Sequence, residues 1–196
     1  GDHDFEGYVF PPDVDLSDFQ FVPNTNFNQA IFRGPARFQG AVFTGDVRFV
    51  GATFEGEAVF AWAKFNGLTA FLHATFVKDA HFLGSTFGKN GTVSFQEATF
   101  EKRVSYEGAK FHKGCCFGRA TFCGNAYFVE STFGAKSVFV RCKFKGEAAF
   151  TKAVFSGAAD FQGVKFLGPT SFRETKFLPS AAGGTKAETT FSGATL

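Results

Sequence analysis

Large apolar residues recur along this chain at alternating intervals of five and six residues, from Phe5 to Leu196. Of the 34 positions in this phenylalanine ladder, 31 are phenylalanine, and the exceptions are Leu16, Tyr106 and Leu196. Two insertions interrupt the count, one of two residues within 88–94 and a longer one within 178–190. Each pair of intervals makes an eleven-residue unit, so the sequence predicts a repeat protein with one elongated body over residues 1–196.

The residues between the ladder positions predict very short strands. The shorter interval reads Phe-x-x-Ala-Thr-Phe in 71–76, and the longer one reads Phe-x-Gly-x-Ala-x-Phe in 144–150. Residues two apart share a face of a strand, so each Ala-x-Phe triplet is expected to turn its alanine and its phenylalanine inward. Alternating intervals of this length match no helical period. Glycines in the longer interval are interpreted as permitting positive φ at a wider corner: Gly34, Gly45, Gly56, Gly67, Gly124, Gly146, Gly157 and Gly168.

This unit resembles that of the pentapeptide-repeat family, in which a small residue and a variable residue precede a large apolar centre. The matching small positions include Ala30, Ala52, Ala74, Ala98, Ala120 and Ala148. The resemblance implies an all-β fold, a right-handed quadrilateral β-helix with four family units per coil. Coils of about 22 residues would give about 8.5 coils and a rod of roughly 40 Å at about 4.8 Å per coil. A flattened two-sheet solenoid with the same inward phenylalanines is the alternative.

The ladder begins five residues into the chain and runs to its last residue, with no terminal helix or polar tail to cover the end coils. Uncovered solenoid ends expose apolar side chains and backbone donors. Three arrangements would cover them: caps outside this chain, an irregular first coil (Pro11, Pro12, Pro23) that caps itself, or head-to-tail stacking of molecules. The absence of an initial methionine and of a signal peptide is expected of a processed chain or a fragment.

Charge distribution favours head-to-tail stacking. Residues 1–26, the acidic first coil, hold six acidic and no basic residues, a net charge of −6, whereas 139–196 hold eight basic and four acidic residues, a net of +4. Opposite charges steer association and fix its polarity, and salt weakens the effect. The expected assembly surface comprises Phe5, Phe10, Asp13, Asp15, Leu16, Asp18, Lys176, Phe177, Phe191 and Leu196.

The four cysteines lack the paired spacing of a zinc site. Cys115 and Cys142 occupy the inward small position, whereas Cys116 and Cys123 are expected to face outward with no cysteine one coil onward. Free thiols are therefore expected, and an intermolecular bridge or a weak metal site at Cys116 or Cys123 stays open as an alternative.

No group of residues predicts catalysis. His73, His81 and His112 are scattered over different unit positions, without a serine or cysteine in register to act as a nucleophile. A rod with a filled interior offers no pocket to orient a substrate. We therefore expect no enzymatic activity and no catalytic, cofactor-binding or metal-binding residues.

The body of the rod is basic. Residues 27–177 hold 19 basic and 11 acidic residues, a net of +8, which favours polyanions in general. Outward aromatic residues are nearly confined to Trp62 and Tyr127, so specific nucleic-acid binding is not expected. Thr53, Thr75, Thr99 and Thr121 should form an outward column that Lys143 and Lys165 continue. No apolar run approaches the roughly 20 residues of a membrane span.

Two functions remain for this chain. The first is a structural β-solenoid that stacks into a filament or fibre, with an extracellular or cell-surface location favoured over the cytoplasm. The second is a monomeric or dimeric protein-binding scaffold that uses the insertions at 88–94 or 178–190 as recognition loops. Some members of the resembling family bind DNA topoisomerases by imitating duplex DNA. That role transfers poorly, because the rod body is basic.

Overall fold

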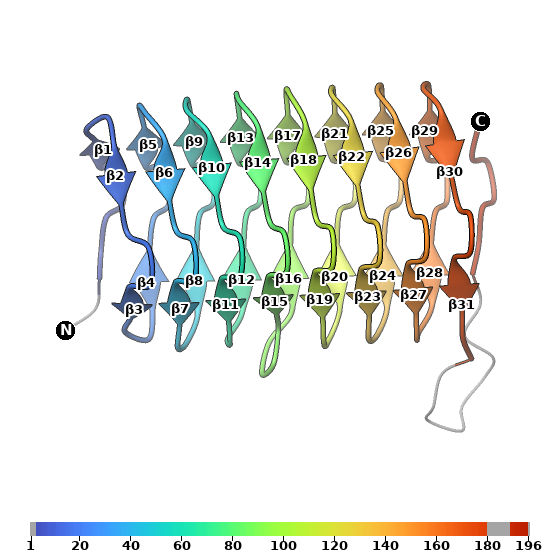
Figure 1. The fold of residues 1–196 in the computed structure, drawn as a ribbon, viewed down its shortest axis with the longest axis horizontal. Coiled ribbons are helices and arrows are strands. Elements are labelled where there is room, and N and C mark those ends of the chain that lie inside the picture. Colours follow the sequence, from blue (N-terminus) through green and yellow to red (C-terminus); the bar gives the residue numbers. More distant parts are fainter. Residues whose placement is uncertain (1–2, 180–188, 196) are drawn as a thin grey trace.

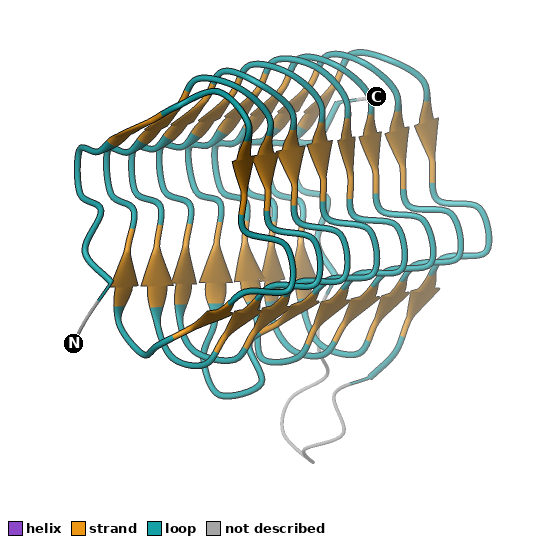
Figure 2. Ribbon diagram, turned by 60° about the vertical axis from the view of Figure 1, so that its left-hand side comes forward, coloured by secondary structure: helices purple, strands orange, loops and turns teal. Residues whose placement is uncertain are grey.

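The chain folds into a stack of coils with four faces. The computed structural model describes residues 3–179 and 189–195, and these contain 31 strands of two residues each and no helix (Figure 1). The strands form four parallel sheets of eight, eight, eight and seven strands, each running along the rod. Figure 2 shows the coils following one another along a single axis. The quadrilateral all-β solenoid is confirmed, and the two-sheet alternative is wrong.

The four sheets follow one another around each coil. Sheet I contains β1 (Val9–Phe10), β5 (Ile31–Phe32), β9 (Thr53–Phe54), β13 (Thr75–Phe76), β17 (Thr99–Phe100), β21 (Thr121–Phe122), β25 (Lys143–Phe144) and β29 (Lys165–Phe166). Sheet II contains β2 (Val14–Asp15), β6 (Ala36–Arg37), β10 (Ala58–Val59), β14 (Ala80–His81), β18 (Val104–Ser105), β22 (Ala126–Tyr127), β26 (Ala148–Ala149) and β30 (Thr170–Ser171). Sheet III contains β3 (Gln20–Phe21), β7 (Val42–Phe43), β11 (Lys64–Phe65), β15 (Thr86–Phe87), β19 (Lys110–Phe111), β23 (Thr132–Phe133), β27 (Val154–Phe155) and β31 (Lys176–Phe177). Sheet IV contains β4 (Thr25–Asn26), β8 (Val47–Arg48), β12 (Thr69–Ala70), β16 (Val93–Ser94), β20 (Cys115–Cys116), β24 (Ser137–Val138) and β28 (Ala159–Asp160).

Strand register gives the length of each coil. Val9 pairs with Ile31, two repeat units onward, and most later pairs keep this step. The step from Thr75 to its partner Thr99 is longer, because the insertion within 88–94 lies between them. The bridge from Asp160 to Thr190 is longer still and spans the second insertion, of which residues 180–188 lie outside the described part. The predicted coil of two units is thus confirmed.

The interior is a set of four stacks of aromatic rings. Phe32 and Phe54, in successive coils, stack at 4.8 Å between ring centroids and 1° between planes. Rings of neighbouring stacks meet edge to face, as Phe54 and Phe60 do at 5.8 Å and 79°. Both geometries are favourable for aromatic pairs. Each fully buried phenylalanine contributes on the order of 2–3 kcal/mol before chain entropy, so this interior dominates stability.

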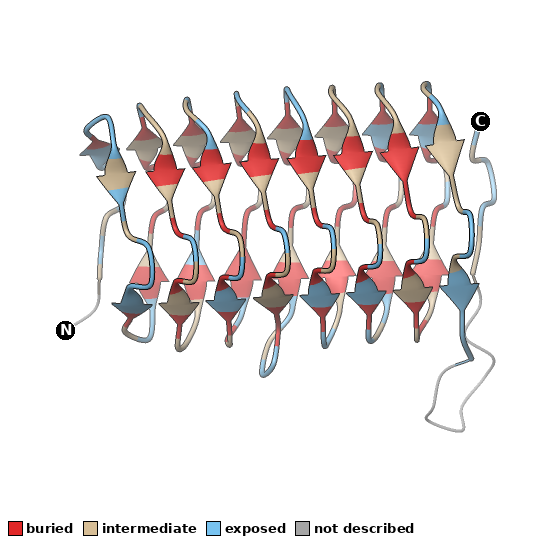
Figure 3. Ribbon diagram, viewed as in Figure 1, coloured by how far each residue is buried: buried red, intermediate tan, exposed pale blue. Residues whose placement is uncertain are grey.

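Burial follows the repeat closely. Figure 3 shows buried positions on every coil of the middle of the rod, with more exposure on the first and last strands. Alanines at the inward small position are buried between the rings, and Phe19, which lies off the ladder, is 43% exposed. The predicted Ala-x-Phe strands are present, but only two residues of each triplet have strand pairing. In Sheets I and III these are the last two residues, and in Sheets II and IV the first two.

The five-residue intervals turn through tight corners with positive φ. In 49–52, the Ala52 amide donates to the Phe49 carbonyl at 3.1 Å, and Gly51 has a φ of 66°. A turn with positive φ at its third residue alone is of type II. All 17 such corners in the described part have positive φ at this position, and ten of these residues are not glycine: Asp18, Gln29, Trp62, His73, Glu97, Arg119, Glu130, Arg141, Lys152 and Glu174.

The glycines of the six-residue intervals have a different role from the predicted one. None of the eight has positive φ. A β-carbon on Gly157 would lie 2.7 Å from the carbonyl carbon of Ala135, and one on Gly168 would lie 2.5 Å from the carbonyl oxygen of Gly146. The prediction of positive φ at these corners was therefore wrong. At these eight corners, glycine lets the backbones of successive coils come into direct contact.

Candidate functional surfaces

The first coil presents a partly covered apolar end. Phe10 is 8% exposed, and Phe5 and Leu16 are half-buried against the ring stacks. The His3 ring lies 5.9 Å from Phe21 at 84° and partly covers it. The sequence interpretation missed His3, because a histidine outside the ladder carries no repeat signal. This residue makes the first coil less open than the ladder suggests.

The last coil presents an open apolar hollow of about 430 Å³, lined by Phe166, Phe172, Phe177, Phe191 and Ala194. Phe177 and Phe191 are 39% and 42% exposed, whereas their equivalents one coil earlier are fully buried. The Phe161 and Phe191 rings still stack at 4.8 Å, so the second insertion leaves the ladder in register. Among the described residues, the hollow is therefore the exposed end of the ring stacks.

The predicted assembly residues divide between these two ends. Phe5, Phe10 and Leu16 belong to the apolar part of the first coil, and the aspartates at its rim are exposed. Phe177 and Phe191 line the hollow, with Lys176 exposed beside them. Leu196 lies outside the described residues. The sequence did not single out Phe166, Phe172 or Ala194, although their ladder or small-residue positions carry enough signal to find them.

The acidic rim has little internal compensation. Hydrogen bonds from Ser17 hold the pKa of Asp15 below its usual value, with a smaller contribution from the charge of Arg37. Arg37 Nη1 also lies 4.0 Å from Asp13 Oδ1, and both side chains are largely exposed. Exposed pairs of this kind contribute little to stability, so the first coil keeps a negative surface.

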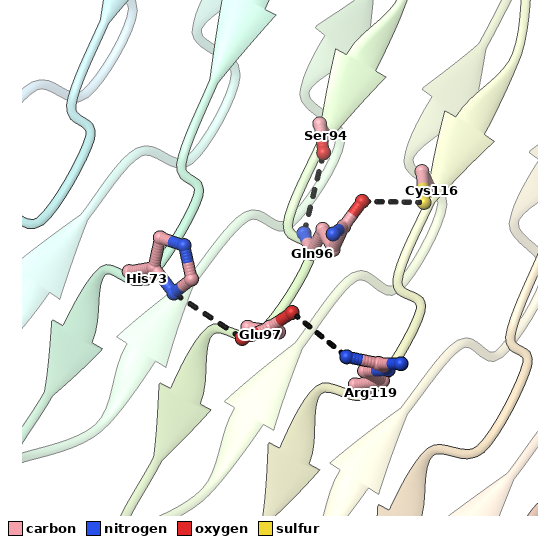
Figure 4. Close-up of polar contacts among 6 residues, drawn as sticks. All are labelled: His73, Ser94, Gln96, Glu97, Cys116 and Arg119. Carbon is pink, nitrogen blue, oxygen red and sulfur yellow. Dashed lines mark hydrogen bonds and ion pairs between the residues drawn. The ribbon is translucent and has the colours of Figure 1, made fainter.

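A line of polar side chains crosses three coils at the corner between Sheets IV and I (Figure 4). Glu97 lies between His73, whose Nδ1 is 3.5 Å from Oε2, and Arg119, whose Nη1 is 3.6 Å from Oε1. Nearby, Cys116 Sγ lies 4.0 Å from Gln96 Oε1. All these groups stand at one corner of the rod, where they link the side chains of neighbouring coils.

The cysteines lie where the sequence predicts them. Cys115 and Cys142 are buried, and Cys116 and Cys123 are partly exposed, all four with free thiols. Burial raises the pKa of Cys115 to about 12 and that of Cys142 further still. Cys142 Sγ donates to the Phe117 carbonyl at 2.8 Å. The buried thiols of Cys115 and Cys142 therefore act as packing residues. On the outside, the strand partner of Cys116 in the next coil is Val138, as expected.

A shallow groove of about 360 Å³ lies on Sheet II, lined by His81, Leu83, Arg103, Ser105, Glu107, Tyr127 and Val129. Arg103 pairs with Asp79 at 2.9 Å. The Tyr127 hydroxyl accepts from Asn125 at 2.9 Å and donates to Glu147 at 3.1 Å. Near it, Trp62 is 58% exposed and covers Gly84. The groove thus combines fixed polar groups with exposed apolar ones.

Within 3–179 and 189–195, His, Cys, Asp and Glu form no group of three placed to hold a metal ion. The same part of the chain contains no helix long and apolar enough to cross a membrane.

The filled interior, four parallel sheets and repeated coil define a β-solenoid scaffold. The sequence model of the pentapeptide repeats matches residues 5–53, 27–69 and 150–182. Together these ranges span 5–69 and 150–182, which is half of the chain. The chain belongs to the pentapeptide-repeat family.

Among solved structures, the chain is similar to HetL, a pentapeptide-repeat protein involved in the regulation of heterocyst differentiation in the cyanobacterium Nostoc. The two are 10% identical over 89% of this chain and 87% of HetL, with a TM-score of 0.24. A search of curated proteins found no match.

Proposed function

We propose that the protein is a non-enzymatic structural solenoid whose molecules stack head to tail into a filament. The observation that carries the proposal is the apolar hollow of the last coil, where Phe172, Phe177 and Phe191 are the outermost described rings of their stacks. The first coil offers Phe5, Phe10 and Leu16 at the opposite end of the ring stacks. Burial of these rings against each other would remove apolar surface from water at both ends.

The eleven-residue unit predicts how two molecules would fit. One coil contains two units, so a second copy turned by half a coil places its five-residue intervals over five-residue intervals of the first copy. In that arrangement Phe5 of the second copy lies over Phe172, Phe10 over Phe177 and Leu16 over Phe191. Sheet I of one copy then continues Sheet III of the other, and their strands have the same x-Phe form. Such a contact is heterologous and does not close, so it propagates.

Charge supports the same polarity. The half-turn places Glu6 of the second copy over Arg173, because each follows a ladder residue directly. The first coil carries a net of −6 against +4 for residues 139–196. This attraction acts between exposed groups and is screened within about 10 Å at 0.1 M salt. Assembly is therefore expected to strengthen as salt concentration falls.

Analytical ultracentrifugation with negative-stain microscopy tests the proposal. The purified chain should form filaments one rod wide that lengthen as the salt concentration is lowered. Phe177→Glu/Phe191→Glu should abolish them, since carboxylates would be buried in the contact. Lys176→Glu should weaken assembly, whereas Lys110→Glu, in the same column three coils earlier, should leave it intact. Monomeric particles at high protein concentration would overturn the proposal.

A monomeric or dimeric protein-binding scaffold is the second candidate function. The groove on Sheet II and the exposed Trp62 favour it, because exposed aromatic and arginine residues often anchor protein contacts. The insertions at 88–94 and 178–190 are the expected recognition loops. In this case the oligomeric state would not depend on salt concentration. Trp62→Ala would remove partner binding and leave the oligomeric state unchanged.

A further inference from the structure

Four cations gather at the C-terminal half of Sheet I. Arg141, Lys143 and Lys145 occupy alternate positions through β25 and its flanking residues, and Lys165 pairs directly with Lys143 in the next coil. All four are exposed. Within the described residues, none of them has a carboxylate oxygen within 4.0 Å.

The acidic residues closest along the chain are engaged elsewhere. Residues 120–170 contain three: Glu130 pairs with Lys152 at 3.6 Å, Glu147 accepts from Tyr127, and Asp160 accepts from the Gln162 amide at 3.0 Å. Within the described part of the chain, the positive charge of the four cations is therefore not balanced by a paired carboxylate, and an external anion would meet it directly.

The apolar component of this surface is Leu167, which is 65% exposed, the most exposed of the large hydrophobic residues in the described part. Its amide donates to the Phe144 carbonyl at 2.8 Å, just as the Lys145 amide donates to Phe122 one coil earlier. Leu167 thus stands one coil beyond Lys145 and two residues from Lys165. Arg141, Lys143, Lys145, Lys165 and Leu167 form the basic face of the rod.

The shape of the basic face distinguishes between anionic ligands. Strands lie about 4.8 Å apart and alternate residues about 7 Å apart, so the cations form a two-dimensional array. A linear polyanion would follow one row of such an array, whereas a planar surface meets all of it. Of the exposed aromatic residues in the described part, none lies on β21, β25 or β29 to stack on bases.

We propose that the basic face docks on the anionic headgroups of a lipid bilayer. The cations attract the charged headgroups, and Leu167 enters the boundary between headgroups and acyl chains. The long axis of the rod then lies in the plane of the membrane, because Sheet I runs along it. Docking on one face leaves both ends of the rod accessible, so this inference does not depend on filament formation.

Vesicle flotation on a density gradient tests the proposal, since protein filaments alone do not float. The protein should float with vesicles that contain phosphatidylserine and remain below with phosphatidylcholine alone. Each cation near an anionic surface changes binding about fivefold, so Lys143→Glu/Lys165→Glu should weaken binding by about 25-fold or more. The matched control is Lys64→Glu/Lys110→Glu, which makes the same charge change at equivalent positions of Sheet III.

A second variant separates a bilayer from a linear polyanion. Leu167→Ser should weaken vesicle binding about tenfold, through lost apolar burial, and should leave retention on heparin unchanged. Thermal melting should show that both variants keep the fold. Failure of the protein to float would overturn the proposal, as would equal losses from the Sheet I and Sheet III variants. Heparin binding that depends on Lys143 and Lys165 without flotation would assign the face to linear polyanions instead.

Discussion

A β-carbon on Gly124 would lie 2.5 Å from the carbonyl carbon of Lys102, one coil earlier. The end of a long side chain could move away from such a contact, but backbone atoms held in a packed coil cannot. Gly124→Ala is therefore expected to lower the free energy of unfolding by about 2 kcal/mol or more, measured by urea denaturation. Gly118, in the same coil, has only Cys116 Sγ at 3.6 Å and Val140 O at 3.8 Å and no positive φ. Gly118→Ala should be neutral or stabilising by about 0.5 kcal/mol, and equal losses at both glycines would contradict this account.

The type II corners predict a gain in stability from glycine. Arg141 has a φ of 57°, a conformation that costs a residue with a β-carbon about 1–2 kcal/mol. Arg141→Gly should raise the free energy of unfolding by up to about 1 kcal/mol, after subtraction of the added chain entropy. Val140→Gly, one residue earlier and without positive φ, should lower it by about 0.5–1 kcal/mol. Thermal denaturation distinguishes the two, and a loss in both variants would exclude strain at Arg141.

Tyr106 is the single tyrosine of the ladder, stacked between Phe82 at 4.8 Å and Phe128 at 5.0 Å. Its hydroxyl is buried and has no hydrogen-bond partner among the described residues. Because such a group costs about 1–3 kcal/mol, Tyr106→Phe should stabilise the fold by about 1 kcal/mol or more. Tyr127→Phe provides the control, since that hydroxyl is partnered at the surface. A loss of stability in Tyr106→Phe would show that the hydroxyl has a partner after all.

Alkaline pH should destabilise the solenoid through its inward thiols. Burial raises the pKa of Cys115 from 9.0 to about 12 and raises that of Cys142 as well. Above pH 9 the unfolded chain therefore releases protons that the folded chain retains, so stability falls as pH rises. Each thiol contributes a slope of up to about 1.4 kcal/mol per pH unit. Denaturation between pH 8 and 10 should show the decline, and Cys115→Ala/Cys142→Ala should flatten it.

The half-turn between stacked molecules can be tested by disulfide trapping. In a background with Cys116→Ala and Cys123→Ala, the pair Glu6→Cys and Arg173→Cys should form a ladder of cross-linked oligomers on oxidation. A stack without the half-turn would instead bring Glu6 over Ser192, so Glu6→Cys with Ser192→Cys is the control pair. Cross-linking of the control alone would reject the half-turn while keeping head-to-tail contact. Cross-linking of neither pair would count against stacking itself.

The sequence predicted most of the architecture because a large apolar residue recurs at every interval of five or six residues. Phe32 and Phe54 stack because two repeat units separate them, and the same spacing located Cys115 at an inward position and Thr53 beside Thr75. These relations depend on register alone, and register can be read from spacing.

Features that depend on backbone conformation or on chain ends could not be read in this way. His73 and Trp62 give no sign in the sequence that they occupy positive φ, since residues of many kinds fill those corners. The close approach at Gly157 depends on how one coil lies over the next, which composition does not specify. His3 covers Phe21 from outside the ladder, where the repeat makes no prediction.

Both insertions follow rungs of one stack of rings, since Phe87 and Phe177 each end a strand of Sheet III. The corner between Sheets III and IV therefore tolerates additional length. After the extra residues, pairing with the preceding coil resumes at Val93 in one case and at Thr190 in the other. This edge of the rod is where a foreign peptide could be displayed, for example after Phe133 or Phe155, at a chosen height along the axis. Peptides inserted in successive coils would lie one strand spacing apart along the axis. The solenoid could therefore hold several peptides in a row at fixed distances from one another.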